Sequence, residues 1–367
     1  MPEFFLRLLA LVKKEFRQML RDRSNLAVGV TLPVIMIMLF GYGISFDLEH
    51  AALAIVDEAG GACADRVAVA LRSSKYFDTR ILRHFAGAEQ MLRRGEVIGI
   101  LRLPGDFDKD ASSGGAAAQL VLNGTEAQSA RTLEAYVSGA LANVRCGVAP
   151  ATPAVTVVPR MWFNEANTST WFIIPGLIGV ILTLIGAFLA SLLVAREWER
   201  GTFEALFVSP VQPLEIVLSK AVPYVAIGLA DVAVVLGFAV FVFDVPIRGS
   251  LAVLAGVSLE FLIVSVLMGL VISALARTQF LASQVALLVS FMPAVVLSGF
   301  IFDLRSMPHW IQPICSLLPA THFMKAIKTV FLVGNEASIV GFEAAVLLGY
   351  ALLFVLLSTK LLAKKLA

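Results

Sequence analysis

Long runs of apolar residues dominate this chain, and shorter polar stretches separate them. A run of about 20 apolar residues forms a helix that can span the roughly 30 Å hydrocarbon core of a bilayer. The runs cover residues 26–46, 171–195, 221–243, 251–276, 280–302 and 341–359. The pattern predicts a polytopic α-helical membrane protein with six transmembrane helices, one first and five after a long gap.

Two stretches outside these runs have other periodicities. Residues 4–20 place apolar side chains on one helical face and Lys and Arg on the other. This favours a helix that lies on a membrane surface or docks on a partner subunit. Residues 47–170 alternate β-like and helical runs, so they predict a small α/β domain. The expected strands are 53–56, 97–103, 119–122 and 154–158, and the expected helices 62–74, 86–94 and 126–145.

Residues 303–340 are mostly apolar, but prolines divide them into pieces that are too short to span a bilayer. Pro308, Pro313 and Pro319 mark these divisions. The pieces predict re-entrant or interfacial helices, with His309 and Trp310 at the depth of the lipid headgroups.

Composition supports the membrane interpretation. Apolar residues make up 58% of the 367 residues and charged residues 15%, against about 25% charged in soluble domains. A net charge of +2 is too small for a nucleic-acid surface. The three cysteines make no disulfide scaffold. Cys63 and Cys146 either pair within the α/β domain or are two buried small side chains.

The distribution of Lys and Arg predicts the orientation. They are concentrated in residues 1–25, residues 196–220 and the C-terminal tail, and are sparse in the short loops between the other ends of the helices. By the positive-inside rule, both termini are cytoplasmic and the α/β domain is extracytoplasmic.

Motifs of catalytic and metal sites are absent from the sequence. There is no P-loop, no H-E-x-x-H motif and no nucleophile elbow. The four histidines are scattered and make no metal cluster. We therefore expect no catalytic centre, cofactor or metal on this chain.

The loop after the second run reads AREWERGTFEALFVSPVQPLEIVLSKAVPY. Gly201 predicts a helix end, and Thr202 can cap a new short helix that Pro210 ends. A rigid helix at about 202–209, between two membrane helices, can act as a lever pushed by a partner. A solvated connector is the alternative.

This loop resembles the signature of ABC-2-type permeases, approximately E-x-E-x-G-T-x-E-x-L-x-x-x-P followed by a lysine. The matching positions are Glu197, Glu199, Gly201, Thr202, Glu204, Leu206, Pro210 and Lys220. A late segment is similar to the family at Ser298, Gly299, Met307, Pro308, Trp310, Pro319 and Gly334. Two positions depart from the family, since His322 stands where Tyr is common and Lys328 where Arg is common.

The resemblance covers the whole chain and is closest to bacterial multidrug efflux permeases. It implies an inner-membrane subunit that pairs with a second copy or a paralogue. It also implies two separate ATPase subunits that bind ATP and Mg. The coupling helix at 202–209, with Arg200 and Phe203 among its signature residues, would dock in a cleft of the ATPase. Substrate identity and a periplasmic adaptor are left open.

The resemblance also implies a domain layout. Residues 1–25 would form a cytoplasmic interface helix, 26–46 the first span, and 47–170 the extracytoplasmic domain. Residues 171–360 would form a five-helix domain, and 361–367 a cytoplasmic tail.

Two acids, Asp231 and Glu260, lie near the middle of the third and fourth runs. An acid at that depth costs about 2.5–3.5 kcal/mol on insertion scales. Each is either part of a substrate path that attracts cations, or a protonated group bonded to a neighbouring helix. They also permit a proton-driven secondary transporter, and a membrane anchor or sensor is a further alternative. The coupling segment and the absence of repeats favour the exporter.

Overall fold

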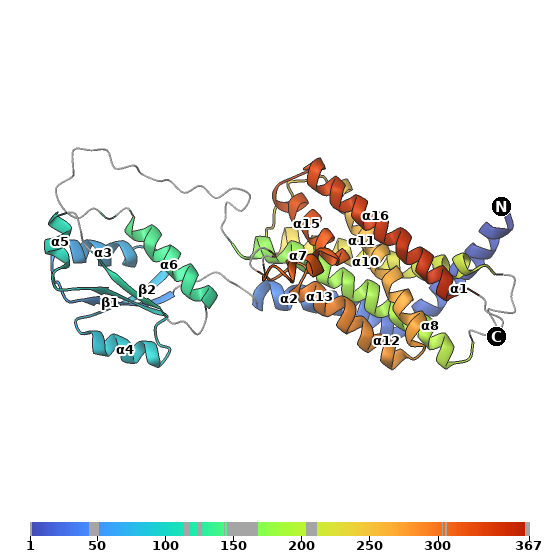
Figure 1. Cartoon of the computed structure of the whole chain (residues 1–367), viewed down its shortest axis with the longest axis horizontal. Helices are drawn as coiled ribbons and strands as arrows, with labels where there is room; N and C mark the ends of the chain where they lie inside the picture. Colours follow the sequence, from blue (N-terminus) through green and yellow to red (C-terminus); the bar gives the residue numbers. More distant parts are fainter. Residues whose placement is uncertain are drawn as a thin grey trace. The chain divides into compact units, whose positions relative to one another are not determined.

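The computed structural model describes residues 2–43, 51–113, 117–122, 127–142, 144, 168–202, 211–302, 304 and 307–363. The chain forms two compact units. The smaller is Ser45–Arg160, and the larger combines Met1–Ile44 with Met161–Ala367. Figure 1 shows an α/β arrangement in the first and a bundle of long helices in the second.

The smaller unit is built on a four-stranded sheet in the order β2-β1-β3-β4. Strands β2 and β3 run parallel to β1, and β4 is antiparallel to β3. Helices α3, α5 and α6 pack on one face and α4 on the other. The strands are β1 (Ala51–Asp57), β2 (Phe77–Leu82), β3 (Gly99–Leu103) and β4 (Gln119–Leu122). The helices are α3 (Ala62–Arg72), α4 (Phe85–Arg93), α5 (Phe107–Ser113) and α6 (Ala127–Leu141).

The central strand β1 explains why this unit is recognisable in the sequence. Its residues 53–56 are all buried, because helices cover both faces of the sheet. The predicted strands at 53–56, 97–103 and 119–122 are confirmed, while β2 and α5 were not predicted. Strand β2 lies at the sheet edge and exposes alternate polar side chains, so it lacks an apolar run. The predicted strand 154–158 lies outside the described residues.

The larger unit is almost entirely helical. Within the described residues, five helices are long and apolar enough to cross a membrane: Thr170–Glu199, Pro213–Phe241, Leu251–Ala276, Gln279–Val296 and Ala337–Leu361. These match the five later runs of the sequence. The predicted span at 26–46 falls on α2 (Arg23–Gly43), whose described apolar part is the shorter helix Gly29–Gly43. The sixth span therefore stays a prediction.

Two of the five spans contain π-helical segments. The first is α7 (Thr170–Thr183), η1 (Leu184–Leu189) and α8 (Ala190–Glu199), and the fourth is α12 (Gln279–Ala286), η2 (Leu287–Phe291) and α13 (Met292–Val296). Segment η2 ends two residues before Pro293, which cannot donate a backbone hydrogen bond. The two π segments contact one another inside the bundle.

The remaining helices complete the bundle. Helix α1 (Pro2–Arg21) precedes α2, and the second, third and fifth spans are α10 (Pro213–Phe241), α11 (Leu251–Ala276) and α16 (Ala337–Leu361). Within the described residues, the segment between α13 and α16 includes the helices α14 (Gln312–Ser316) and α15 (Pro319–Leu332). They fall within the predicted re-entrant segment 303–340.

The span that contains α7 and α8 is the most deeply buried, while α16 and α12 present many apolar side chains outward. Close helix packing depends on small residues. A side chain at Gly269 of α11 would place its Cβ 2.5 Å from the Ala187 carbonyl oxygen of η1.

Candidate functional site

Helix α8 ends where the sequence predicts. Gly201 adopts a left-handed backbone with φ of +67°, and its N–H donates to the Trp198 carbonyl at 3.1 Å. Only glycine takes this conformation at little cost, so the chain leaves the helix here in a fixed direction. The Thr202 N–H and hydroxyl both donate to the Glu197 carbonyl, at 3.1 and 3.4 Å. Arg200, the C-cap, is exposed.

The predicted coupling helix begins just beyond this turn. Of its predicted residues, Phe203, Glu204, Leu206 and Pro210 lie outside the described residues. The described structure therefore gives the base from which that segment leaves and the helix to which it returns. The helix itself stays a prediction.

A buried group of charges joins the base of this loop to two other helices. We call Lys14, Glu15, Glu197 and Lys220 the charge cluster. The Lys220 ammonium is 2% exposed and lies 2.8 Å from Glu197 Oε1 and 3.4 Å from Glu15 Oε1. Lys14 Nζ lies 3.2 Å from Glu15 Oε1 and 3.6 Å from Glu197 Oε1. The two acids and two bases compensate one another, so three helices share one balanced set of charges.

The charge cluster affects the pKa of Lys14. Burial lowers the pKa of Lys14, but the carboxylates of Glu15 and Glu197 outweigh this effect and hold it above the ordinary value for lysine. Removing one partner of a buried pair leaves an uncompensated charge, at a cost of about 3–5 kcal/mol. Helices α1, α8 and α10 are therefore held in register at this point.

A second connection links α1 to the first turn of α10. The Glu215 carboxylate is fully buried and accepts hydrogen bonds from Arg7 Nε at 3.2 Å and from the Gln212 N–H at 2.7 Å. With the Gln212 side chain, Glu215 forms a capping box that begins α10. This explains why α10 begins at Pro213, ahead of the apolar run predicted from residue 221.

A third connection links the last turn of α8 to α1 and α12. Arg196 pairs with Asp22, just after α1, and also donates to the Gln279 side chain at 3.2 Å. Glu199 accepts from the Gln279 N–H at 2.8 Å and from its side-chain amide. The Arg277 guanidinium lies 5.1 Å from the centroid of the Trp198 ring. Any displacement at the end of α8 therefore reaches α1, α12 and the residue that caps α11.

Three residues of the predicted signature, Glu197, Glu199 and Lys220, take part in these contacts. Five of their partners were not predicted, and these are Arg7, Glu15, Asp22, Glu215 and Gln279. Two signals point to missed residues. Glu15 falls on the buried stripe of α1 between Leu11 and Met19. Glu215 stands three residues after a helix cap.

Helix α1 uses only part of its apolar face within this chain. It packs on α10 through a stripe that includes Phe16 and the buried Met19. Of the predicted face, Phe5, Leu9 and Leu20 are 72%, 63% and 60% exposed. The helix therefore presents a second, largely exposed apolar stripe, which suits either a membrane surface or a partner subunit.

The two predicted acids are separated by the structure. Asp231 is buried on the α10 face that packs on α11, one turn from Gly228, where a Cβ would meet Leu262 of α11. Its Oδ2 and the Ser258 hydroxyl oxygen of α11 are both buried without a hydrogen-bond partner among the described residues. Glu260 is half-buried and follows Ser258 by two residues, so it projects from the opposite side of α11.

The predicted external residues lie around α14 and α15. Pro308 is exposed, as is Trp310 at 72%. Pro319 is the first residue of α15, and Gly334 ends that helix with φ of +117°. Lys328 Nζ donates to the Gly299 carbonyl at 2.7 Å and lies 3.4 Å from the centroid of the Phe172 ring. Lys328 thus joins α15 to α7 and to the turn after α13.

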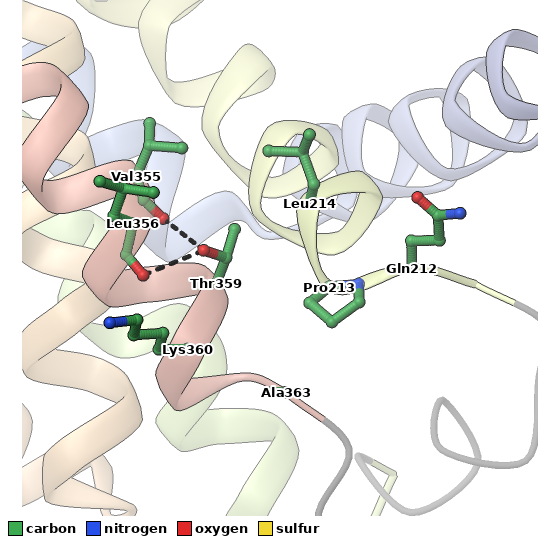
Figure 2. Close-up of a pocket in the computed structure, with 8 residues that line it drawn as sticks. All are labelled: Gln212, Pro213, Leu214, Val355, Leu356, Thr359, Lys360 and Ala363. Atoms are coloured by element: carbon green, nitrogen blue, oxygen red, sulfur yellow. Dashed lines mark hydrogen bonds between the residues drawn. The ribbon is translucent and has the colours of Figure 1, made fainter.

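A groove of about 470 Å³ lies between the first residues of α10 and the last turns of α16 (Figure 2). Its walls are mostly apolar. The Thr359 hydroxyl donates within α16 to the Val355 and Leu356 carbonyls, at 2.9 and 3.0 Å, so it offers little to a ligand. The lining residues are Gln212, Pro213, Leu214, Val355, Leu356, Thr359, Lys360 and Ala363.

The smaller unit contains a disulfide-bonded cysteine. Cys63, in the first turn of α3, is disulfide-bonded, whereas Cys315 of α14 is a free and buried thiol. Of the alternatives left open by the sequence, the bonded state holds for Cys63. Cys146 lies outside the described residues.

Comparison with known proteins covers nearly the whole chain. The family described as "ABC-2 family transporter protein" matches residues 26–360. Escherichia coli (strain K12) has a "Probable multidrug ABC transporter permease YbhS" that is 35% identical over 95% of this chain and 94% of that protein. The "Probable multidrug ABC transporter permease YbhR" of the same strain is 29% identical over 92% of each chain. "ABC transporter G family member 20" of Dictyostelium discoideum is 24% identical over 89% of this chain and 46% of that protein.

Proposed function

Because the chain belongs to the ABC-2 family of transporter permeases, we propose that it forms the membrane path of an exporter powered by separate ATPase subunits. The observation that carries the proposal is the convergence of α1, α8, α10 and α12 at the base of the loop 200–212. A force applied to that loop meets a set of helices that are already tied together.

The transmission of force follows from the contacts. A push on the segment after Gly201 acts on the last turn of α8, because the turn there is closed by two backbone hydrogen bonds. The charge cluster passes it to α1 and α10, and Gln279 passes it to α12. Two N–H groups of α8, those of Val194 and Ala195, donate to the Ser273 hydroxyl at 3.0 and 2.9 Å, so α11 moves with α8.

The assembly that suits this role contains two permease copies, or one copy and a paralogue, and two ATPase subunits that hold ATP and Mg. The coupling helix at about 202–209 docks on an ATPase, and both termini face the cytoplasm of a bacterial cell. The smaller unit lies outside the inner membrane and is available to a periplasmic adaptor. Two relatives carry the words multidrug and permease in their names, which supports drugs or other amphiphilic compounds as substrates.

The decisive experiment uses the full chain reconstituted in liposomes with its ATPase. Glu199→Lys removes both hydrogen bonds that the Glu199 carboxylate accepts from Gln279. We expect ATP hydrolysis to continue while export per ATP falls by about tenfold, which corresponds to a lost coupling of about 1.4 kcal/mol.

The matched control is Glu89→Lys, which removes a carboxylate paired with Arg93 in the smaller unit. The control should export like the parent chain. Equal export per ATP in both variants would contradict the lever role of α8. Export driven by a proton gradient without the ATPase would instead support a secondary transporter.

A further inference from the structure

His322 of α15 has an acceptor at each of its ring nitrogens. Nε2 lies 2.9 Å from the Ser316 carbonyl oxygen, and Nδ1 contacts the Glu343 carboxyl group of α16. A carbonyl oxygen only accepts hydrogen bonds, so Nε2 carries a hydrogen. The tautomer of the ring is thereby fixed, and only the protonation of the Nδ1–Glu343 contact can change.

That contact needs one proton. In one arrangement the proton is on Nδ1, and an imidazolium donates to a carboxylate. In the other the proton is on Glu343, and a neutral acid donates to Nδ1. When the proton is lost, the Nδ1 lone pair faces a carboxylate oxygen, and two acceptors repel one another. The contact between α15 and α16 therefore exists as a hydrogen bond only when the pair holds this proton.

Few other polar groups surround the buried pair of His322 and Glu343. His322 and Glu343 are 7% and 5% exposed, and Lys325 Nζ lies 3.6 Å from Glu343 Oε1. The Tyr350 ring is centred 6.2 Å from the His322 ring, and its hydroxyl donates to the Leu317 carbonyl.

The helices packed against α15 add little charge to the site. Helices α14 and α7 contribute no charged residue, and the one charged residue of α11 is Glu260. Lys328 of α15 itself is engaged with Gly299 and Phe172. Within the described structure, Lys325 is thus the one further charge that contacts the pair.

We infer that His322 and Glu343 form a proton-binding site that fastens α15 to α16. The inference goes beyond the proposed transport function and does not rest on it. The hydrogen bond exists only while the pair holds this proton, so the fastening responds to the pH of the water that reaches Lys325. Binding of the proton closes the contact, and its release loosens α15 from α16.

Thermal unfolding of the purified full chain in detergent tests the site at about pH 6 and pH 8.5. The protonated pair makes one hydrogen bond more than the deprotonated pair, so stability is present at the lower pH and is lost as the pH rises. We expect the parent chain to unfold several degrees lower at the higher pH. In Glu343→Gln, the amide can donate to Nδ1 or accept from it, so the midpoint should be the same at both pH values.

The control Glu336→Gln changes an exposed carboxylate at the N-cap of α16. Its unfolding midpoint should depend on pH as that of the parent chain does. Nuclear magnetic resonance of chains labelled with ¹⁵N in the histidine rings gives a second measurement. We expect the His322 ring, identified by its shift in Glu343→Gln, to pass between two states as the pH rises. Parallel unfolding curves in parent and Glu343→Gln, or an unchanging His322 signal, would overturn the inference.

Discussion

A single glycine sets the direction in which the chain leaves α8. Gly201 has φ of +67°, and among the described residues a Cβ at this position would meet no atom within 4 Å. The constraint that the described structure shows at this position is therefore one of backbone conformation. A side chain in the left-handed region costs about 1–2 kcal/mol, so any other residue shifts the path of the coupling segment.

Gly201→Ala should therefore reduce export more than it reduces stability. Export per ATP in liposomes is expected to fall severalfold while the unfolding midpoint changes little. Gly95→Ala is the control, since Gly95 has φ of +71° in an equally open turn of the smaller unit. If both variants lowered export to the same extent, the direction of the turn after α8 would not matter for coupling.

The role of Asp231 can also be tested with a single substitution. Its buried Oδ2 has no hydrogen-bond partner among the described residues. Asp231→Asn keeps the shape and removes the ability to hold a negative charge. If Asp231 lies on the substrate path, export of cationic compounds should fall by about tenfold and export of neutral ones should continue. Asp78→Asn, at an exposed site of β2, is the control. Equal export of both classes by Asp231→Asn would mean that Asp231 has a structural role.

At the scale of helices and strands, the apolar runs predicted the spans because the thickness of the bilayer fixes their length. The helix ends were less predictable. Helix α10 begins earlier than its apolar run, because the capping box of Gln212 and Glu215 extends it. Strand β2 was missed since its exposed edge position permits polar residues. The contacts of Glu15 and Lys220 could not be predicted, because periodicity carries no information about which distant helices meet.

The close approach of α11 and η1 at Gly269 can be tested by substitution. Gly269→Val would place a Cβ 2.5 Å from the Ala187 carbonyl oxygen, a backbone atom that cannot move alone. Overpacking of this kind costs about 1–3 kcal/mol, so the unfolding midpoint in detergent should fall. Gly256→Val lies on the same helix, where a Cβ meets nothing within 4 Å, and should unfold like the parent chain. A Gly269→Val midpoint equal to that of Gly256→Val would contradict this packing.

At the scale of the whole molecule, the chain combines an α/β unit and a helical unit, and the two differ in the pattern of apolar residues along the sequence. The smaller unit has its own core on both faces of a sheet. The larger unit is a helical bundle in which polar residues gather at the helix ends and at a few interior positions. The family relatives align across both units, so the two units occur together in these relatives as well.

The charge cluster also has a consequence for how the protein is made. Glu15 is synthesised 205 residues before its partner Lys220. Glu197 and Lys220 emerge close together, but their joint environment is complete only when α1 is in place. Until then, Glu15 has its neighbour Lys14 as a partner but not Lys220. The contact between α1 and α10 therefore forms late in biogenesis, because it needs two helices that are synthesised far apart in time.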